Sequence, residues 1–383
     1  MKLAVLTHYI TSYRISTFVA LKRKVEHLTL LLSSDLSDPK LRDTGIDVRV
    51  LPSVLIPRKR RHPNGFVETY SVHVPYGVIG ALRSIRPDAI HAHELGLRTL
   101  WATGYSAMSG TPMVIHADLS EETEKKWGGG RTMLRKAILA RTDRVAVNGA
   151  SGARYIEGLG YPSDRIDRLP FATDVEKFSS VRPLWRDDGV RRLLYVGRLI
   201  ELKGLERFIE VLGRYLADRP QLRAELTLVG SGDRVPTIQA VPRPANLELR
   251  MPGAIPYEQL GTFYGQADTF VLPTLGDTWG LVVNESMSAG LPVLGSTLAQ
   301  ASLEMIRDGE TGWLYDPRSD EQMSAAIGRF FDTPVPTLAR MGEQARAVAL
   351  EITPDRVAQS FVDSCEAALR ARALLRQPAS RVR

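Results

Sequence analysis

The chain has 383 residues, of which 44% are hydrophobic and 24% charged, so it is an ordinary globular protein whose length fits two domains better than one. Its formal net charge of +7 favours anionic partners such as sugar nucleotides, phospholipids or nucleic acid, without choosing among them. Cys365 is the only cysteine, which excludes an internal disulfide and a cysteine-based zinc site. No apolar run is long enough to cross a bilayer, and the N-terminal run is too short for a signal peptide, so we expect a cytoplasmic protein.

Short apolar runs rich in Val, Ile and Leu alternate along the chain with longer segments of helical period. The first series predicts strands at Leu3–Leu6, Leu28–Leu32, Val48–Leu51, Ala89–Ala92, Met113–His116 and Arg144–Val147. The second series predicts strands at Leu193–Val196, Glu225–Val229, Leu247–Arg250, Thr269–Leu272, Pro292–Leu294 and Trp313–Tyr315. Strands that alternate with helices indicate parallel sheets covered on both faces, and therefore an α/β protein.

The break between the two series lies near Ala172–Arg192, a polar stretch that we interpret as an interdomain linker. We therefore predict an N-terminal domain at residues 1–175 and a C-terminal domain at residues 190–353. A last helix is expected from about Pro354 to about Leu375, because proline is favoured in the first turn of a helix. The sequence allows this segment, 354–377, to pack back on the first domain.

The most informative segment is Pro273–Val293, PTLGDTWGLVVNESMSAGLPV, in which a predicted strand is followed by a loop and a short helix. Ligands of open parallel sheets bind outside the carboxyl ends of the strands. Gly280 would let a ligand approach the backbone closely. The N–H groups of Leu281 and Val282 at the start of the helix could then hold phosphate oxygens.

Two carboxylates flank that helix start. Asp277 lies in the loop before the helix and Glu285 lies inside the helix. Carboxylates accept strong hydrogen bonds from hydroxyl groups, so the pair could grip a sugar-containing ligand at two points. The alternative is that Asp277 only satisfies the helix dipole, which leaves Glu285 unexplained.

A second segment, Tyr195–Gly204, reads YVGRLIELKG. The strand ends at Val196 and Gly197, Arg198 follows at its tip, and Lys203 opens the next helix. Two cations at one strand–helix junction could neutralise a diphosphate leaving group. The alternative is that both are solvated surface charges, but their place at the junction favours the ligand site.

Residues 193–315 resemble the donor-binding domain of glycosyltransferase family 4, and the resemblance extends more weakly over most of the chain. That family carries an acidic residue and a glutamate eight positions apart in a phrase that is matched here by Asp277, Trp279, Gly280, Leu281 and Glu285. It also carries an Arg…Lys-Gly motif, which is matched by Arg198, Lys203 and Gly204. The resemblance implies a GT-B fold, in which two Rossmann-like parallel-sheet domains face each other across a central cleft.

The resemblance also implies roles for these residues. Arg198 and Lys203 would bind the donor diphosphate, Glu285 the ribose, and Asp277 the transferred sugar. Most family members have Glu where this chain has Asp277, which shortens the reach to the sugar and leaves the preferred sugar open. The family often has a glycine-rich loop after its first strand, whereas this chain reads THYITSYRISTF there, so the usual contact of that loop cannot be carried over.

Histidines stand at two strand ends of the first half. The resemblance makes His116 the candidate for a functional histidine that orients the donor sugar or handles a proton, the alternative being a histidine that caps a loop. His91 and His93, with Glu94, could suggest zinc. Glu94 falls on the opposite face if the strand continues, so a position lining the ligand site is favoured over a metal site.

The chemistry of the leaving group also bears on metals. A departing nucleoside diphosphate is neutralised either by a divalent ion on an Asp-x-Asp motif or by Arg, Lys and a helix N-terminus. The chain has no Asp-x-Asp and offers the second set. We therefore expect no cofactor and no metal, with a UDP- or GDP-linked sugar as substrate. Retention at the anomeric carbon is implied by the resemblance alone.

Two basic stretches remain. Arg58–Arg61 reads RKRR in what we interpret as a proline-flanked loop, and Arg131–Arg144 reads as a basic helix with an apolar stripe. Such a helix either lies on an anionic membrane surface or packs on its own sheet. No aromatic stacking motif or nucleic-acid fold accompanies these stretches, so nucleic acid is not expected as a partner.

The sequence thus predicts a retaining, metal-independent glycosyltransferase that acts on a glycan or lipid-linked acceptor. We expect it in the cytoplasm, with a peripheral position on the inner face of the cell membrane as an alternative. Two other functions stay open at this stage: a sugar-nucleotide epimerase of similar fold, and a catalytically silent relative that only binds a sugar nucleotide.

Overall fold

The computed structural model describes residues 1–61, 67–124 and 129–376. The chain divides into two compact units, which are treated separately below. Unit 1 is Met1–Pro170 together with Pro354–Arg383, and unit 2 is Phe171–Thr353. Each contains a parallel β-sheet flanked by helices, so the α/β prediction is confirmed.

The sheet of unit 1 has the strand order β3-β2-β1-β6-β7-β8-β9, and all its neighbouring pairs are parallel. Its strands are β1 (Lys2–Thr7), β2 (His27–Leu32), β3 (Asp47–Val50), β6 (Ala89–His93), β7 (Met113–Ala117), β8 (Arg144–Val147) and β9 (Ile166–Arg168). Residues Leu3–Leu6 are at most 1% exposed. Burial of the central strands on both faces explains their continuous apolar runs.

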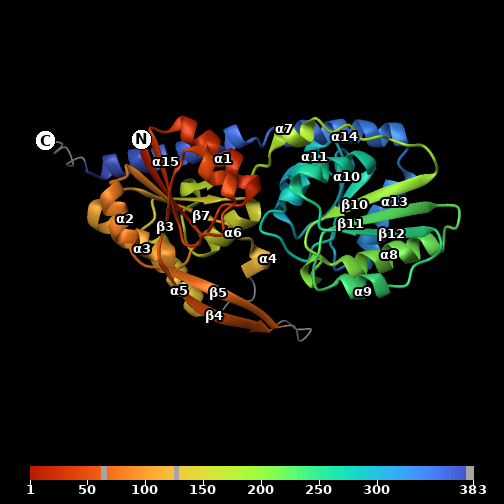
Figure 1. Ribbon diagram of the computed structural model, residues 1–383, viewed down its shortest axis with the longest axis horizontal. Coiled ribbons are helices and arrows are strands. Elements are labelled where there is room, and N and C mark those ends of the chain that lie inside the picture. The colour runs from red at the N-terminus through yellow and green to blue at the C-terminus, as the bar shows by residue number, and fades with distance from the viewer. Residues whose placement is uncertain (62–66, 125–128, 377–383) are drawn as a thin grey trace. The chain divides into compact units, whose positions relative to one another are not determined.

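The helices of unit 1 connect these strands and cover the sheet. They are α1 (Ser12–Lys24), α2 (Val78–Ile85), α3 (Leu97–Ser109), α4 (Glu121–Glu124), α5 (Gly129–Leu139), α6 (Ala150–Gly158) and α15 (Pro354–Arg376), with short 3₁₀ turns at Pro39–Thr44 and Ser163–Arg165. Helix α15 packs against α1 and against β6, β7 and β8 (Figure 1), so the last helix belongs to unit 1.

An antiparallel hairpin also belongs to unit 1. Strands β4 (Ser53–Arg61) and β5 (Val67–Pro75) pair in register from Ser53 opposite Pro75 to Arg61 opposite Val67, and Figure 1 shows the hairpin projecting from the unit. The interpretation of Arg58–Arg61 as a loop is therefore wrong. Proline is tolerated in a two-stranded ribbon, where its missing N–H can face solvent, so Pro57 does not end the strand. The side chains of residues 58–72 lie outside the described ones.

The basic helix predicted at Arg131–Arg144 is shorter than expected. Helix α5 ends at Leu139, and Arg144 already begins β8. Arg135 is 3% exposed and bonded to Glu124 inside unit 1, whereas Met133 is 74% exposed. The polar pair Thr142–Asp143 separates the two elements, because both residues bond to neighbouring backbone: Thr142 Oγ1 donates to the carbonyl of Ile138 and Asp143 accepts from the N–H of Met113.

The sheet of unit 2 has the order β12-β11-β10-β13-β14-β15, again parallel throughout. Its strands are β10 (Val190–Val196), β11 (Arg223–Val229), β12 (Leu247–Gly253), β13 (Thr269–Leu272), β14 (Val293–Ser296) and β15 (Gly312–Tyr315). The chain runs outward from β10 to β12 and then returns to the other side of β10 with β13. The order therefore reverses between β10 and β13, and ligands of such sheets bind at that switch point.

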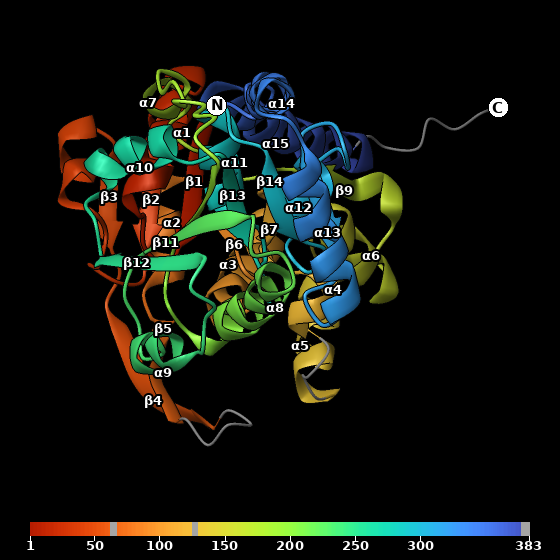
Figure 2. The same ribbon diagram turned by 90° about the vertical axis from the view of Figure 1, so that its right-hand side faces the viewer.

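The helices of unit 2 are α7 (Val175–Ser179), α8 (Leu205–Ala217), α9 (Val235–Ala240), α10 (Leu260–Gln266), α11 (Leu281–Ser288), α12 (Gln300–Met305), α13 (Asp320–Asp332) and α14 (Val335–Ala349), with 3₁₀ turns at Glu201–Lys203 and Tyr257–Gln259. Helices α8 and α13 pack together (Figure 2), and α11 packs against α7 and α14 (Figure 1). The stretch interpreted as a linker contains α7, which is therefore a packed part of unit 2.

Candidate functional site

The loops after β10 and β13 are bound to each other at the switch point of unit 2. The carbonyl oxygen of Leu202 accepts from the N–H of Leu275 at 2.8 Å and from Thr274 Oγ1 at 3.1 Å. Gly204 has a φ of +64°, and a Cβ atom there would lie 2.4 Å from the carbonyl oxygen of Pro273. Only glycine permits this approach, which brings the two loops together.

This approach joins two of the predicted site residues. Lys203 Nζ donates to Asp277 Oδ2 at 2.7 Å, and the two side chains are 16% and 21% exposed. A cation and a carboxylate that are 74 positions apart in the sequence thus share one partly open place at the sheet edge. A phosphate group and a sugar hydroxyl could be bound there side by side.

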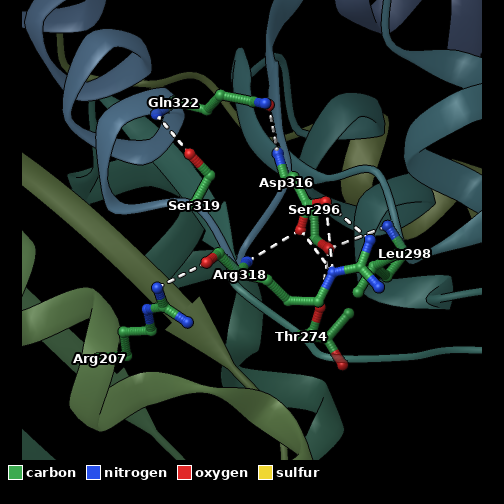
Figure 3. Close-up of polar contacts among 8 residues, drawn as sticks. All are labelled: Arg207, Thr274, Ser296, Leu298, Asp316, Arg318, Ser319 and Gln322. Atoms are coloured by element: carbon green, nitrogen blue, oxygen red, sulfur yellow. Dashed lines mark hydrogen bonds and ion pairs between the residues drawn. The ribbon is translucent and has the colours of Figure 1, made fainter.

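The backbone around Asp277 is fixed from strand β14. The N–H of Asp277 donates to the carbonyl of Leu298 at 3.0 Å, and the N–H of Leu298 donates to Ser296 Oγ at 3.0 Å. Ser296 Oγ in turn donates to the carbonyl of Thr274 at 2.7 Å, as Figure 3 shows. Ser296 is fully buried, so its hydroxyl ties the end of β14 to the loop that carries the carboxylate.

Helix α11 begins at Gly280, whose φ of +98° lies in the region that favours glycine. Among the residues that the structure describes, no acceptor takes the N–H groups of Leu281 and Val282, which lie in the first turn. Trp279 is 2% exposed, and its Nε1 donates to Asn284 Oδ1 at 2.8 Å. The indole thus anchors the helix start and leaves two amides available to an anion.

Glu285 lies inside α11 and is 4% exposed. Tyr264 Oη donates to its Oε2 at 2.9 Å. Burial raises the pKa of Glu285 to about 7, although the hydrogen bond from Tyr264 and the positive charge of Lys177 act in the opposite direction. The carboxyl group is therefore held in place but is close to its protonation midpoint at neutral pH.

Arg198 is exposed at the tip of β10. Its carbonyl accepts from Tyr195 Oη at 2.8 Å, and a Cβ atom at Gly197 would lie 2.8 Å from the same hydroxyl. At the far end of this edge Arg318 is bound to Asp316 at 2.7 Å (Figure 3), whereas no ion pair of Arg198 occurs within the described residues. Arg198 is therefore a cation that a ligand can reach.

His116 lies in the core of unit 1 rather than at its surface. It is fully buried in β7, and its ring centroid is 4.9 Å from that of His93. His91 lies beside Phe361 of α15 at 4.2 Å between centroids. Burial lowers the pKa of His116 to about 3, so the ring is neutral at neutral pH. This enclosure supports a packing role more directly than contact with a substrate.

A polar chain leads from His116 towards the surface. His116 Nε2 lies 2.6 Å from Asn148 Oδ1, and Asn148 Nδ2 donates to Asp118 Oδ1 at 2.6 Å. Because Asn148 presents its oxygen to the ring, Nε2 is the donor nitrogen. Sequence reasoning missed Asn148 and Asp118, although Asn148 directly follows a predicted strand and Asp118 lies two positions after one, which is the signal that could have found them.

Histidine and acidic residues do not form a metal centre in residues 1–61, 67–124 and 129–376, where no group of three or more potential ligands gathers. Glu94 is 61% exposed and lies 3.9 Å from Arg98 rather than beside His91 and His93. The zinc alternative for these histidines therefore has no support. Helices long and apolar enough to cross a membrane are also absent from this part of the chain.

Comparison with known proteins matches both halves of the chain. Residues 180–348 match the family model described as glycosyl transferases group 1, and residues 15–172 match the glycosyl transferase 4-like domain. The D-inositol 3-phosphate glycosyltransferase of Paenarthrobacter aurescens is 28% identical over 299 residues, 73% of this chain and 72% of that protein. The enzyme of the same name from Nocardia farcinica is 28% identical over 351 residues, 85% of this chain and 73% of that protein.

Solved structures share the fold. The Anabaena protein HepE in complex with UDP has a TM-score of 0.72 at 15% identity, with 96% of this chain and 100% of that chain covered. The lipopolysaccharide outer core galactosyltransferase WaaB has a TM-score of 0.71 at 16% identity, with coverage of 95% and 99%. At such identities the likeness extends to the fold alone.

Proposed function

Since the chain belongs to the group 1 glycosyltransferases, we propose that it transfers a sugar from a nucleoside-diphosphate sugar, bound by unit 2, to an acceptor bound by unit 1. The observation that carries the donor assignment is the gathering of Lys203, Asp277 and the start of α11 at the switch point of the unit 2 sheet. A nucleotide sugar presents a diphosphate, a ribose and a hexose to such an edge.

The leaving diphosphate would be neutralised by the protein itself. Arg198 and Lys203 supply positive charge, and the N–H groups of Leu281 and Val282 supply donors at the positive end of the α11 dipole. Preorganised donors of this kind stabilise developing negative charge without a metal ion. The proposal is therefore metal-independent transfer, with retention of anomeric configuration carried over from the family.

The two carboxylates would divide the sugars of the donor. Glu285 would accept from the ribose hydroxyls and Asp277 from the transferred sugar. Because Lys203 already holds Asp277 at 2.7 Å, donor binding must leave Lys203 shared between that carboxylate and the diphosphate. A glycan or lipid-linked acceptor completes the proposal, and a UDP- or GDP-linked sugar is the first donor to test.

The test is binding of nucleoside diphosphates, with UDP and GDP first. Binding is measured as a change in the melting temperature of the protein, with and without EDTA. A ligand that binds only the folded state must raise the melting temperature. A rise with one base supports the donor site and its metal independence. No rise with any base, or a rise that EDTA abolishes, contradicts the corresponding part of the proposal.

Variants locate the site. Arg198→Ala and Lys203→Met each remove a charge-assisted contact worth about 1.5–3 kcal/mol, so the dissociation constant of the nucleotide should rise about tenfold or more. Arg340→Ala is the matched control, because Arg340 is an exposed arginine of α14 in the same unit. Full transferase activity of Asp277→Asn would remove Asp277 from the proposed mechanism.

A further inference from the structure

Unit 1 has a switch point of its own. Its strand order β3-β2-β1-β6-β7 reverses between β1 and β6, just as that of unit 2 reverses between β10 and β13. His8 follows β1 directly, and the segment after β6 leads through Glu94 into helix α3. By the rule that places ligands at switch points, these residues border the ligand site of unit 1.

Arg98, in the first turn of α3, is buried there with one long ion pair, to Glu94. Its side chain is 7% exposed, and its Nε and Nη1 atoms make no hydrogen bond. The ion pair joins Nη2 to Glu94 Oε2 at 3.9 Å, too far for a hydrogen bond, and the Glu94 side chain is 61% exposed. A buried guanidinium group whose Nε and Nη1 atoms make no hydrogen bond is costly unless an anion accepts from them.

His8 lies near enough to Arg98 for the two groups to interact electrostatically. His8 lies against His73 with ring centroids 4.4 Å apart. Burial first, and then the positive charge of Arg98, lower the pKa of His8 to about 4, so this ring is neutral at pH 7. A neutral imidazole can donate a hydrogen bond to an anion without adding a competing charge.

We propose that the switch point of unit 1 is an anion-binding site, in which the guanidinium of Arg98 binds a phosphate group carried by the acceptor. A guanidinium fork matches two phosphate oxygens, and the orphaned Nε and Nη1 atoms are the donors that such a group would satisfy. The assignment of the phosphate to the acceptor rests on the proposed glycosyltransferase function. The site itself is defined by unit 1 alone.

The phosphate could belong to a soluble ester or to a phospholipid. The same helix exposes Leu97, Leu100 and Trp101, at 40%, 39% and 46%, which a lipid acceptor could cover. Sedimentation with phosphatidylglycerol vesicles, compared with phosphatidylcholine vesicles, separates the two sources. Sedimentation that requires Arg98 identifies a lipid phosphate, and equal sedimentation of wild type and Arg98→Met identifies a soluble one, provided that the phosphate shift described next is present.

The closing experiment measures melting temperature in inorganic phosphate against chloride at matched ionic strength, without any nucleotide. The full chain carries Arg198→Ala throughout, which weakens the proposed diphosphate site of unit 2. Dependence of the result on Arg98 then separates unit 1 from phosphate bound by Lys203 and the start of α11, whether or not the donor proposal holds. Phosphate should raise the melting temperature of this chain. Adding Arg98→Met should abolish the rise, whereas adding Arg83→Met, an exposed arginine of α2, should leave it intact.

The melting temperature in chloride gives a second readout. Removing a buried charge whose one ion pair is long and exposed should leave the Arg98→Met chain as stable as its parent or more stable, because methionine fills much of the volume without a desolvated cation. No phosphate shift in the parent chain, or a shift that survives Arg98→Met, overturns the proposal. A fall in the melting temperature of Arg98→Met in chloride also overturns it, because Arg98 would then serve the fold.

Discussion

The buried carboxyl group of Glu285 should make the protein less stable as the pH rises from about 4.5 to about 7. Its pKa lies at about 7 in the folded chain, compared with 4.5 for an unperturbed glutamate. Between these values the folded state binds more protons than the unfolded state, so the free energy of unfolding falls as pH increases and levels off above the folded pKa. The difference corresponds to about 3 kcal/mol at most.

The perturbation that tests this is Glu285→Gln. Glutamine is nearly isosteric, and its amide oxygen can still accept from Tyr264 Oη, which donates at 2.9 Å in the wild type. The variant removes the titration, so it should melt several degrees higher than wild type at pH 8, at roughly 2–4 °C per kcal/mol for a unit of this size. At pH 5 the difference should shrink to about 1 kcal/mol or less, because the folded carboxyl group is then protonated and only the unfolded state still gains from ionisation.

The assay is thermal unfolding of both proteins from pH 5 to pH 8, with Glu210→Gln as the control. Glu210 is an exposed glutamate of α8 in the same unit, so its substitution should leave the pH dependence of wild type unchanged. If wild type and Glu285→Gln show the same dependence on pH, or if the variant is destabilised at pH 8, the carboxyl group is ionised and stabilised in the folded state, and the reasoning fails.

Three further substitutions test the local geometry by chemical denaturation. Gly204→Ala should destabilise the protein by about 1–3 kcal/mol, because φ is +64° there and the added Cβ would lie 2.4 Å from the Pro273 carbonyl oxygen. The control Gly104→Ala, in the open interior of α3, should stabilise the protein by up to about 1 kcal/mol. Equal effects of the two substitutions would contradict this reasoning. Trp279→Phe should cost about 1–3 kcal/mol by leaving Asn284 Oδ1 without its 2.8 Å donor, and a neutral effect would show that the bond is dispensable. Arg346→Met should cost about 3 kcal/mol or more, because the carbonyls of Ser179, Val181 and Ala289 all lose a donor, and a cost under about 1 kcal/mol would contradict that accounting.

The sequence was sufficient for the two parallel sheets apart from the three-residue edge strand β9, and it was insufficient for the hairpin. Strands such as Leu3–Leu6 are buried on both faces, and burial of that kind leaves a continuous apolar run that can be read directly. The β4–β5 hairpin carries basic residues and Pro57, and it exposes Val54 and Leu55 at 55% and 56%. Because apolar side chains such as Val54 and Leu55 are exposed, the apolar pattern that marks a buried strand is missing at the start of the hairpin, and the sequence alone favoured a loop.

The residues of the candidate sites also divide into those that the sequence predicts and those that it does not. Residues directly after strands, such as Arg198 and Asp277, could be found from the position rule, whereas the pairing of Asp277 with Lys203 depends on the close packing of two loops. Tyr264, which holds Glu285, lies in the middle of α10 and carries no sequence signal. The enclosure of His116 could not be foreseen either, because Phe361 reaches it from α15, more than two hundred positions later in the chain.

A comparison of the two switch points gives a physical reason why the loop after β1 can lack glycine. In unit 2, Gly197 and Gly204 permit backbone approach, and the amides of α11 are available to phosphate oxygens. After β1 in unit 1 the chain places His8 instead of glycine, and the first turn of α3 contributes Arg98. Recognition by backbone amides requires glycine, whereas recognition by a guanidinium and an imidazole does not. The departure from the family pattern is therefore consistent with an anion site that has moved from backbone to side chains.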